Sequence, residues 1–437
     1  MAFATIYDQY AAANKRLAKG EPLFFTGSGN QWQFTERKTS ASHRLRYPHI
    51  GVYTGIGTSH SWLWFVDLFD RMGFHNLSFL NETTLRDGGL AGLDVLAISG
   101  GDTFAIAGAL GKTGAKEIKQ FIRKGGLYIG SCAGAYLPMN SSKSPLNLFN
   151  FADVKISNLS KTLPDCHQLR YKFSTAYGCC FVFHPVREVV GLRFNSRFPI
   201  ADAGRITAPL YGGPGMIAAN GTQILGRYET FTDKTVFLVD EALAIKALIG
   251  KAAAVRANLG CGSLYLFGPH LEHPRYPEAN KVVADTIFYD TGRADKNDSA
   301  TRIKSEKLSD SVSEHLILEL KRELSNARIV AAGLEMLPIR WLIGTKYYEP
   351  EKIRVFLESM WRRIKSLEAR GRVYTNNQTP ADLSAWAKEI TRLLRLMKNE
   401  LEQNCDTLPV AGRLFTLLQK MTAAYLQMYF LTVSESS

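Results

Sequence analysis

The sequence predicts an α/β fold with helices on both faces of a parallel sheet, followed by a smaller all-α helical bundle. In the first part, short apolar runs alternate with segments of helical spacing, as in parallel sheets whose strands are joined by helices. After residue 312, only helical patterns occur. Between the two parts, residues 293–312 are rich in Ser, Asp, Lys and Asn, which is typical of a solvated linker. We therefore expect an α/β domain at 1–292 and a helical domain at 313–437.

The apolar runs of the first domain define its elements. We expect strands at residues 49–54, 77–80, 93–98, 127–129, 235–239 and 262–268, and helices at 60–72 and 112–124. Residues 1–19 predict a short amphipathic helix, whereas residues 20–47 and most of 145–249 show no clear pattern. Ligands of open α/β sheets bind beyond the carboxyl ends of the strands. Gly100, Gly101 and Cys132 follow two of these strands and should lie there.

The second domain has the pattern of about four antiparallel helices. Leu316, Leu320 and Leu324 share one helix face. Residues 379–382 read Thr-Pro-Ala-Asp, which combines an N-cap, a proline in the first turn and an acidic residue at a helix start. We expect this domain to offer a surface for a protein partner.

Charge and cysteine content limit the function classes. The 437 residues carry a formal net charge of +13, but basic and acidic residues alternate, so we expect no specific nucleic-acid binding. The cysteines at 132, 166, 179, 180, 261 and 405 have no paired spacing, which favours reduced thiols in a cytoplasmic protein. The apolar segment 414–433 contains Lys420 and two glutamines, so we expect a packed helix and no membrane span.

The strongest local signal is the stretch around Cys132. Residues 130–134 read Gly-Ser-Cys-Ala-Gly and lie between an apolar strand and a helix start. A nucleophile elbow has this arrangement, because small residues two positions before and after the nucleophile let the chain fold back sharply. The alternative is an ordinary turn that carries a buried cysteine.

A thiol nucleophile needs a base, and the base needs a group that orients it. His270 and Glu272 provide both, because residues two apart on extended chain point to the same side. The alternative is a loop histidine next to a surface glutamate. A metal site built from His270, His273 and Cys261 is a weaker possibility, since the sequence shows no second ligand pair. We expect neither a metal nor a cofactor.

Acyl chemistry at a thiol also needs N–H donors for the developing oxyanion. In an elbow these are the N–H after the nucleophile, here Ala133, and an N–H from a neighbouring loop, here Gly100 or Gly101. The loop with Gly212 and Gly213 either brings backbone groups to a ligand or forms a plain tight turn. Residues 55–57 read Gly-Ile-Gly but lack the third glycine of a dinucleotide fingerprint.

Together these motifs resemble the class I glutamine amidotransferase-like superfamily. The nearest resemblance is to the amidotransferase-like domain at the N-terminus of some biotin-protein ligases. The residues that carry it are 52–59, 99–102, 130–136, 211–213 and 268–272, within a region of roughly 48–285. The resemblance implies a flavodoxin-like sheet, with Cys132 as nucleophile, His270 as base and Glu272 as the residue that orients it. It does not imply a ligase module, because no biotin-ligase glycine-arginine motif is found.

One residue departs from the superfamily pattern. Working glutaminases usually carry a glutamine four residues after the nucleophile, where this chain has Tyr136. Tyr136 therefore argues against free glutamine as the substrate. We expect a cysteine-dependent amidotransferase-like enzyme or hydrolase that acts on a small-molecule or peptide amide or an ester. The alternative is a catalytically silent ligand-binding or scaffold protein that keeps the fold.

Overall fold

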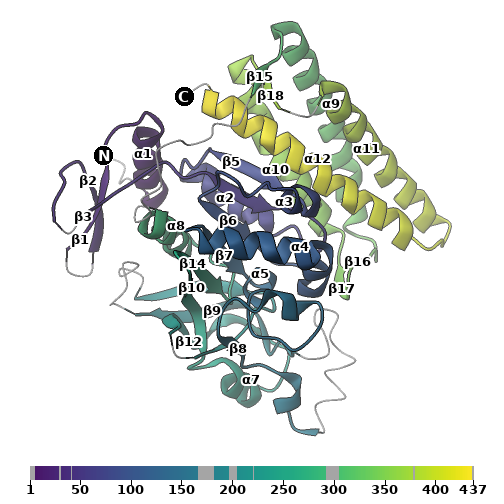
Figure 1. Cartoon of the computed structure of the whole chain (residues 1–437). Helices are drawn as coiled ribbons and strands as arrows, with labels where there is room; N and C mark the ends of the chain where they lie inside the picture. Colours follow the sequence, from purple (N-terminus) through teal and green to yellow (C-terminus); the bar gives the residue numbers. More distant parts are fainter. Residues whose placement is uncertain are drawn as a thin grey trace. The chain divides into compact units, whose positions relative to one another are not determined.

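The computed structural model describes residues 5–28, 31–40, 42–165, 182–195, 204–219, 221–291, 305–376 and 379–435. The chain forms two compact units, one from Met1–Phe74 and Leu80–Ser299 and the other mainly from Ala300–Ser437. The first contains a large sheet with helices, and the second is a bundle of helices (Figure 1). This confirms the predicted fold class.

The parallel part of the sheet positions the candidate site. Its strands are β4 (Ile50–Tyr53), β5 (Leu77–Leu80), β6 (Val95–Ile98), β7 (Leu127–Ser131) and β14 (Gly262–Phe267). They lie in the order β14-β7-β6-β4-β5, and the pairs β14·β7, β7·β6 and β6·β4 are parallel. Every residue of β6, β7 and β14 is buried, as expected for parallel strands covered on both faces.

The other half of the sheet is antiparallel, and most of its strands come from the region in which the sequence shows no clear pattern. It continues from β14 through β13 (Ala252–Leu259), β12 (Gln223–Phe237) and β9 (Val186–Phe194) to β10 (Arg205–Leu210). The short strands β8 (Val154–Ile156) and β11 (Met216–Ala218) pair with each other, and β11 also pairs with β13. The pairing of β12 with β9 shifts register twice, so this long strand shows no simple alternation in sequence.

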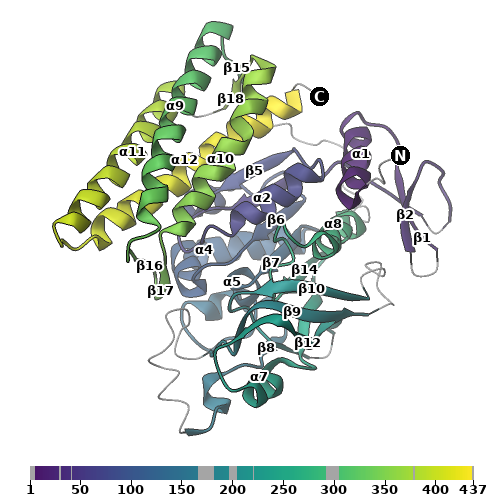
Figure 2. The ribbon, with the colours of Figure 1, turned by 180° about the vertical axis from the view of Figure 1, so that it is seen from behind.

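Helices cover both faces of the sheet. Figure 1 shows α4 (Thr103–Arg123) over one face, and Figure 2 shows α2 (Trp62–Arg71) and α8 (Pro277–Thr291) over the other. The predicted helix 112–124 is the second half of α4, which breaks at Gly111, where φ is 57°. Ile106, Ile118 and Ile122 of α4 join the hydrophobic core cluster on their side of the sheet. The described part of this unit also contains the shorter helices α3 (Glu82–Arg86), α5 (Ala133–Tyr136) and α7 (Glu241–Leu248).

The N-terminal segment adds a small sheet that the sequence pattern did not reveal. Helix α1 (Ile6–Ala18) precedes the antiparallel strands β1 (Phe24–Ser28), β2 (Gln31–Thr35) and β3 (Ser42–Arg44). The buried Phe25 ring lies 5.5 Å from the ring of Phe34 and 6.3 Å from that of Phe288, measured between centroids. This aromatic contact joins the small sheet to α8.

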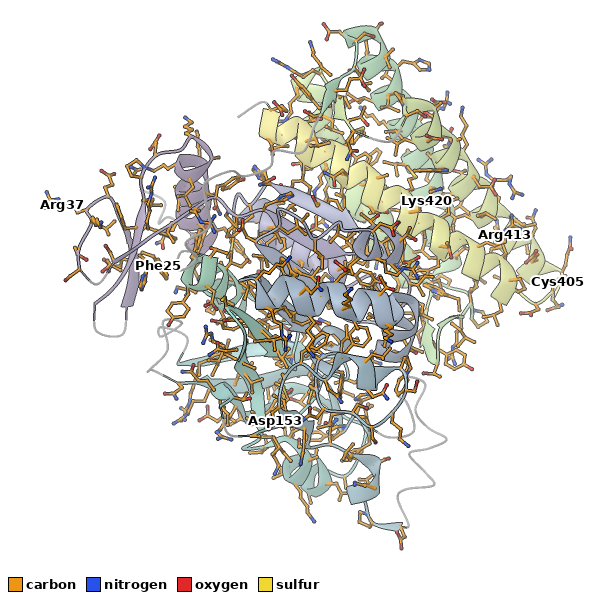
Figure 3. The ribbon with its side chains drawn as sticks, viewed as in Figure 1. Phe25, Arg37, Asp153, Cys405, Arg413 and Lys420 are labelled. Atoms are coloured by element: carbon orange, nitrogen blue, oxygen red, sulfur yellow. The ribbon has the colours of Figure 1, made fainter. Side chains whose placement is uncertain are left out.

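The second unit is a bundle of α9 (Asp310–Leu334), α10 (Glu351–Arg370), α11 (Pro380–Glu402) and α12 (Leu408–Glu435). Both α9 and α12 pack against α10 and α11. The hairpin β16 (Trp341–Ile343) and β17 (Lys346–Tyr348) connects α9 to α10. Cys405 lies at the exposed turn between α11 and α12 (Figure 3). The Lys420 Nζ of α12 lies over the Trp386 ring, 4.2 Å from its centroid.

The predicted helix start at Thr379 is confirmed. The backbone N–H of Asp382 donates to the Thr379 hydroxyl at 3.2 Å, and the Asp382 carboxylate accepts from the Thr379 backbone N–H at 3.2 Å, which is a capping box. In the predicted linker, residues 293–304 lie outside the described part. Beyond them, β15 (Glu306–Lys307) pairs with β18 (Tyr374–Thr375) before α9 begins. Among the described helices, none combines the length and apolar character needed to cross a bilayer.

Candidate functional site

Three neighbouring parallel strands bring the predicted site residues together. β6, β7 and β14 lie side by side and run in the same direction. Gly100 follows β6, Cys132 follows β7 and His270 follows β14. The topology therefore places all three residues at one edge of the sheet, as expected for a ligand site in an open α/β sheet.

The backbone at Cys132 has an unusual conformation. Its φ is 52° and its ψ is −108°, which few residues other than glycine adopt. A Cβ at Gly130 would collide with the carbonyl of Gly134, and a Cβ at Gly134 would collide with that of Ile98. The Tyr128 hydroxyl donates to the Gly134 carbonyl at 2.6 Å and fixes the turn. Both flanking glycines are thus required by close backbone packing.

The Cys132 thiol is almost fully covered. The residue is 3% exposed, and its Sγ lies 4.0 Å from the backbone carbonyl oxygen of Tyr211. By contrast, Cys261 and Cys405 are exposed, whereas Cys166, Cys179 and Cys180 lie outside the described residues.

His270 and Glu272 form a buried hydrogen-bonded pair. His270 Nδ1 lies 2.7 Å from Glu272 Oε1, and the two residues are 2% and 0% exposed. Because a carboxylate only accepts, Nδ1 carries the proton and Nε2 is left to face the site. The pair meets in a turn, in which the His273 N–H donates to the His270 carbonyl at 3.2 Å, and not on extended chain as the i, i+2 argument assumed.

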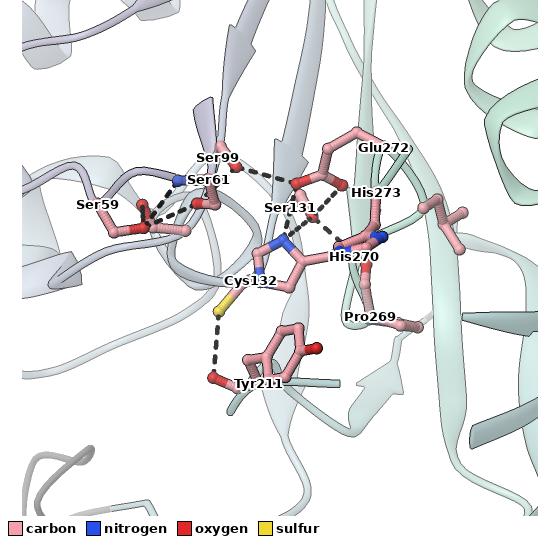
Figure 4. Close-up of polar contacts among 12 residues, drawn as sticks. Ser59, Ser61, Ser99, Ser131, Cys132, Tyr211, Pro269, His270, Glu272 and His273 are labelled. Atoms are coloured by element: carbon pink, nitrogen blue, oxygen red, sulfur yellow. Dashed lines mark hydrogen bonds and ion pairs between the residues drawn. The ribbon is translucent and has the colours of Figure 1, made fainter. Parts of the chain in front are cut away.

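Two serines that the sequence analysis missed complete the surroundings of Glu272. Ser99 Oγ donates to Glu272 Oε1 at 2.9 Å, and Ser131 Oγ donates to Oε2 at 2.8 Å (Figure 4). Both serines are fully buried. The signal that could have found them is a polar residue at the carboxyl end of an otherwise apolar strand.

The charges around His270 favour its protonated form. Burial by itself favours the neutral imidazole, but the Glu272 carboxylate and contact with Cys132 outweigh burial and raise the pKa of His270 to about 10. At neutral pH, the imidazolium is therefore the stable form next to the thiol.

Aromatic rings surround this pair. The Trp64 ring centroid lies 4.9 Å from that of His270 and 4.5 Å from that of His273, both edge-on. Burial and the positive charge of His270 lower the pKa of His273 to about 4, so His273 is neutral at pH 7. Within the described residues, no group of three His, Cys, Asp or Glu side chains could hold a metal ion.

The predicted oxyanion-loop residues lie next to His270. A Cβ at Gly100 would be 2.8 Å from His270 Cε1, so the backbone of Gly100 is in contact with the imidazole ring. Gly101 has a φ of 152°, and a Cβ there would collide with the Gly57 carbonyl. Ala133 is the first residue of the short helix α5, where backbone N–H groups have no intrahelical acceptor.

The remaining predicted residues are placed by packing. Gly213 packs against the backbone of Gly268, at the end of β14, and a Cβ there would collide with the Gly268 carbonyl. Gly212, with a φ of 99°, contacts the His184 ring. The two glycines therefore let the Tyr211 loop approach the strand that carries His270. Tyr136 is partly buried and packs against the core cluster on the α4 side of the sheet.

The sequence of the sheet region matches a known family. Residues 50–145 match the family model described as "Biotin-protein ligase, N terminal". The match confirms the resemblance inferred from the sequence. The matched segment runs from β4 past α5 and includes Gly100, Gly101 and Cys132, whereas His270 and Glu272 lie beyond it. No curated protein matches the chain significantly.

Several solved structures are distantly similar. A ThuA-like protein from Bacteroides uniformis aligns with 10% identity and a TM-score of 0.35, over 60% of this chain and 96% of that chain. A β-galactosidase from Bacillus circulans aligns with 10% identity and a TM-score of 0.31, over 57% of this chain and 32% of that chain. An exo-β-1,4-mannosidase from an Opitutaceae bacterium aligns with 11% identity and a TM-score of 0.29, over 57% of this chain and 37% of that chain. This chain thus spans 32% and 37% of the two glycosidases, and similarity at this level indicates neither activity nor substrate.

Proposed function

We propose that this protein is a cysteine-dependent enzyme with an amidotransferase-like fold that acts on an amide or an ester. Cys132 is the nucleophile, His270 the proton carrier and Glu272 the residue that orients it. The observation that carries the proposal is the buried His270–Glu272 pair, with Nδ1 and Oε1 2.7 Å apart, at the same sheet edge as the strained Cys132. The match to the biotin-protein ligase N-terminal family supports the fold on which this assignment rests.

In the proposed reaction, the Cys132 thiol gives its proton to Nε2 of His270, which leaves a thiolate beside an imidazolium. The Cys132 thiolate attacks the substrate carbonyl carbon, a C–S bond forms and the carbonyl π electrons move to oxygen. The N–H groups of Ala133 and the Gly100–Gly101 loop are the candidate donors to that oxyanion. The imidazolium of His270 gives its Nε2 proton to the leaving amine or alcohol as the tetrahedral intermediate collapses to a thioester. His270, now neutral, then takes a proton from the water that hydrolyses the thioester and frees the thiolate.

Tyr136 affects which substrate we expect the site to accept. In the superfamily that this chain resembles, working glutaminases usually carry a glutamine at this position, and the bulkier Tyr136 packs on the core instead. We propose a small-molecule or peptide amide, or an ester, other than free glutamine. Ammonia release from free glutamine should therefore be undetectable, and robust release would overturn this choice of substrate.

The decisive experiment is acylation of the thiol by p-nitrophenyl acetate, followed by intact-protein mass and peptide mapping. We expect an acetyl group on Cys132, and His270→Ala should slow its formation by a factor on the order of 10². Glu272→Gln should slow it less, because it misorients the base without removing it. Cys405→Ser is the matched control, since Cys405 is an exposed thiol far along the chain in the helical bundle, and this variant should acylate Cys132 at the wild-type rate.

The near-complete burial of Cys132 favours one alternative, a ligand-binding or scaffold protein that keeps this fold without turnover. If the protein only binds a ligand or a partner, Cys132 should stay unmodified in the folded wild type, or Cys132 of the His270→Ala variant should be acylated as fast as in the wild type. Either result would reject the enzyme proposal.

A further inference from the structure

A line of buried hydroxyl groups leads to Glu272 from the other side of the site. Ser59 Oγ lies 2.8 Å from Ser61 Oγ, Ser61 Oγ lies 3.0 Å from Ser99 Oγ, and Ser99 Oγ lies 2.9 Å from Glu272 Oε1 (Figure 4). All three serines are buried. Serine side chains in such positions need hydrogen-bond partners, because an unsatisfied buried hydroxyl is costly.

Ser99 links the line of serines to the carboxylate. Ser99 Oγ is placed to donate its one proton either to Ser61 Oγ at 3.0 Å or to Glu272 Oε1 at 2.9 Å. The charged carboxylate is the stronger acceptor of the two. Between Ser59 and Ser61, either hydroxyl can be the donor. A hydroxyl group that donates to a buried carboxylate stabilises its charge.

The far end of the line reaches the Gly100 backbone. The Gly100 carbonyl accepts from the Ser59 backbone N–H at 3.0 Å, and Ser59 Oγ lies 3.2 Å from the same oxygen. Ser61 Oγ lies 2.8 Å from the place where a Gly100 Cβ would stand. The serines after β4 therefore contact both the loop after β6 and, through Ser99, the acid of the pair after β14.

Ser131 holds the second carboxylate oxygen. Its Oγ donates to Glu272 Oε2 at 2.8 Å, and it lies 3.5 Å from His270 Nδ1. With Ser99 and the imidazole on Oε1, Glu272 has hydrogen-bond donors on both oxygens. This prevents the carboxylate from rotating away from His270.

We propose that Ser61, Ser99 and Ser131 are positioning residues that fix the Glu272 carboxylate against His270, with Ser59 tying this network to the Gly100 backbone. The proposal rests on the function proposed above, since it concerns how the same site keeps its imidazole in place. These serines act through Glu272 and do not contact the reacting atoms themselves.

The first test is spectroscopic and independent of turnover. The Nδ1–H proton of His270 should give a low-field NMR resonance, identified by its absence in His270→Ala. In the double variant Ser99→Ala/Ser131→Ala, this resonance should move upfield and exchange faster with water. Ser263→Ala is the matched control: Ser263 is also buried and accepts from Arg256 at 2.7 Å, but it lies at the opposite end of β14. Its variant should leave the resonance unchanged.

The second test is a double-mutant cycle on alkylation of Cys132 by iodoacetamide. The double serine variant should react about 10-fold more slowly than the wild type, because it loses two charge-assisted hydrogen bonds to Glu272. In a Glu272→Ala background, the same serine changes should alter the rate by less than about 2-fold. Ser99→Thr, which keeps the hydroxyl, should restore most of the reactivity lost in Ser99→Ala.

The outcomes separate the two proposals. An unchanged resonance in the double serine variant would overturn the positioning role. So would an equal loss of rate with and without Glu272, because that would be a general packing defect. If the resonance moves as expected but the wild type transfers no acyl group, the network stands and the enzymatic function fails.

Discussion

Gly100→Ala is the sharpest probe of the site, because it adds one methyl group and removes no functional atom. The new Cβ would stand 2.8 Å from both His270 Cε1 and Ser61 Oγ, whereas ordinary van der Waals contact begins at 3.4 Å. The imidazole would have to move by roughly 0.6 Å to relieve this contact. Its Nδ1 is already 2.7 Å from the Glu272 carboxylate, so the ring cannot retreat in that direction without compressing that hydrogen bond.

A displacement of this size should matter more for reactivity than for folding. Overpacking typically costs about 1–3 kcal/mol of the free energy of unfolding. Acylation of Cys132 should fall by a factor on the order of 10 to 10², because a half-ångström error in a proton donor is enough to weaken catalysis. The acetylation rate, measured by mass spectrometry, and unfolding in urea provide the two readouts.

Gly108→Ala is the matched control for this variant. Gly108 lies in α4, and a Cβ there would meet nothing within 4 Å. Alanine should therefore raise the free energy of unfolding by about 0.5–1 kcal/mol and leave acylation unchanged. If Gly100→Ala acylates within about 2-fold of the wild type at unaltered stability, contact between the Gly100 backbone and the imidazole does not set the reactivity of the site.

Three further predictions concern pH, the linker and the bundle. Since the pKa of His270 is raised from 6.5 to about 10, its charge stabilises the fold fully below pH 6.5. The stability advantage of the wild type over His270→Gln in urea should shrink by a few kcal/mol between pH 6.5 and 10, and a constant difference would contradict the pKa. Limited proteolysis should cut first within 293–312 and leave two stable fragments; cuts scattered through both would refute two domains. Thr379→Ala should lower the free energy of unfolding of the bundle by about 1 kcal/mol, measured by thermal melting, whereas Thr379→Ser should not.

The sequence predicted those parts of the fold in which one physical signal dominates. β6 is apolar throughout, and β7 and β14 each carry a single serine, because both of their faces are covered, so each gives a nearly continuous apolar run. The helix start at Thr379 was predicted because its cap, its proline and its acidic residue lie within four consecutive residues. The antiparallel half of the sheet was not, because β12 is partly exposed and bulged, which removes the alternation that would reveal it.

The candidate site also contains some residues that could be predicted from the sequence and others that could not. Cys132, His270 and Glu272 were predictable because each lies in a short motif. Ser99 and Ser131 were not, because their role depends on three strands that meet only in the folded sheet. The turn at residues 270–273 also escaped prediction, since the i, i+2 spacing brings the two side chains together in a turn as well as on extended chain.

The backbone conformation of Cys132 lowers the stability of the fold, yet this residue carries the thiol that the proposed chemistry needs. A residue with a β-carbon at φ 52° and ψ −108° carries strain of about 1–3 kcal/mol, which glycine would relieve. If variants of this chain were selected in the laboratory for thermal resistance alone, glycine should arise at position 132, and the thiol would be lost with it. Selection that also required reaction at the thiol would have to find its added stability elsewhere, for example at Gly108, where a side chain fits freely.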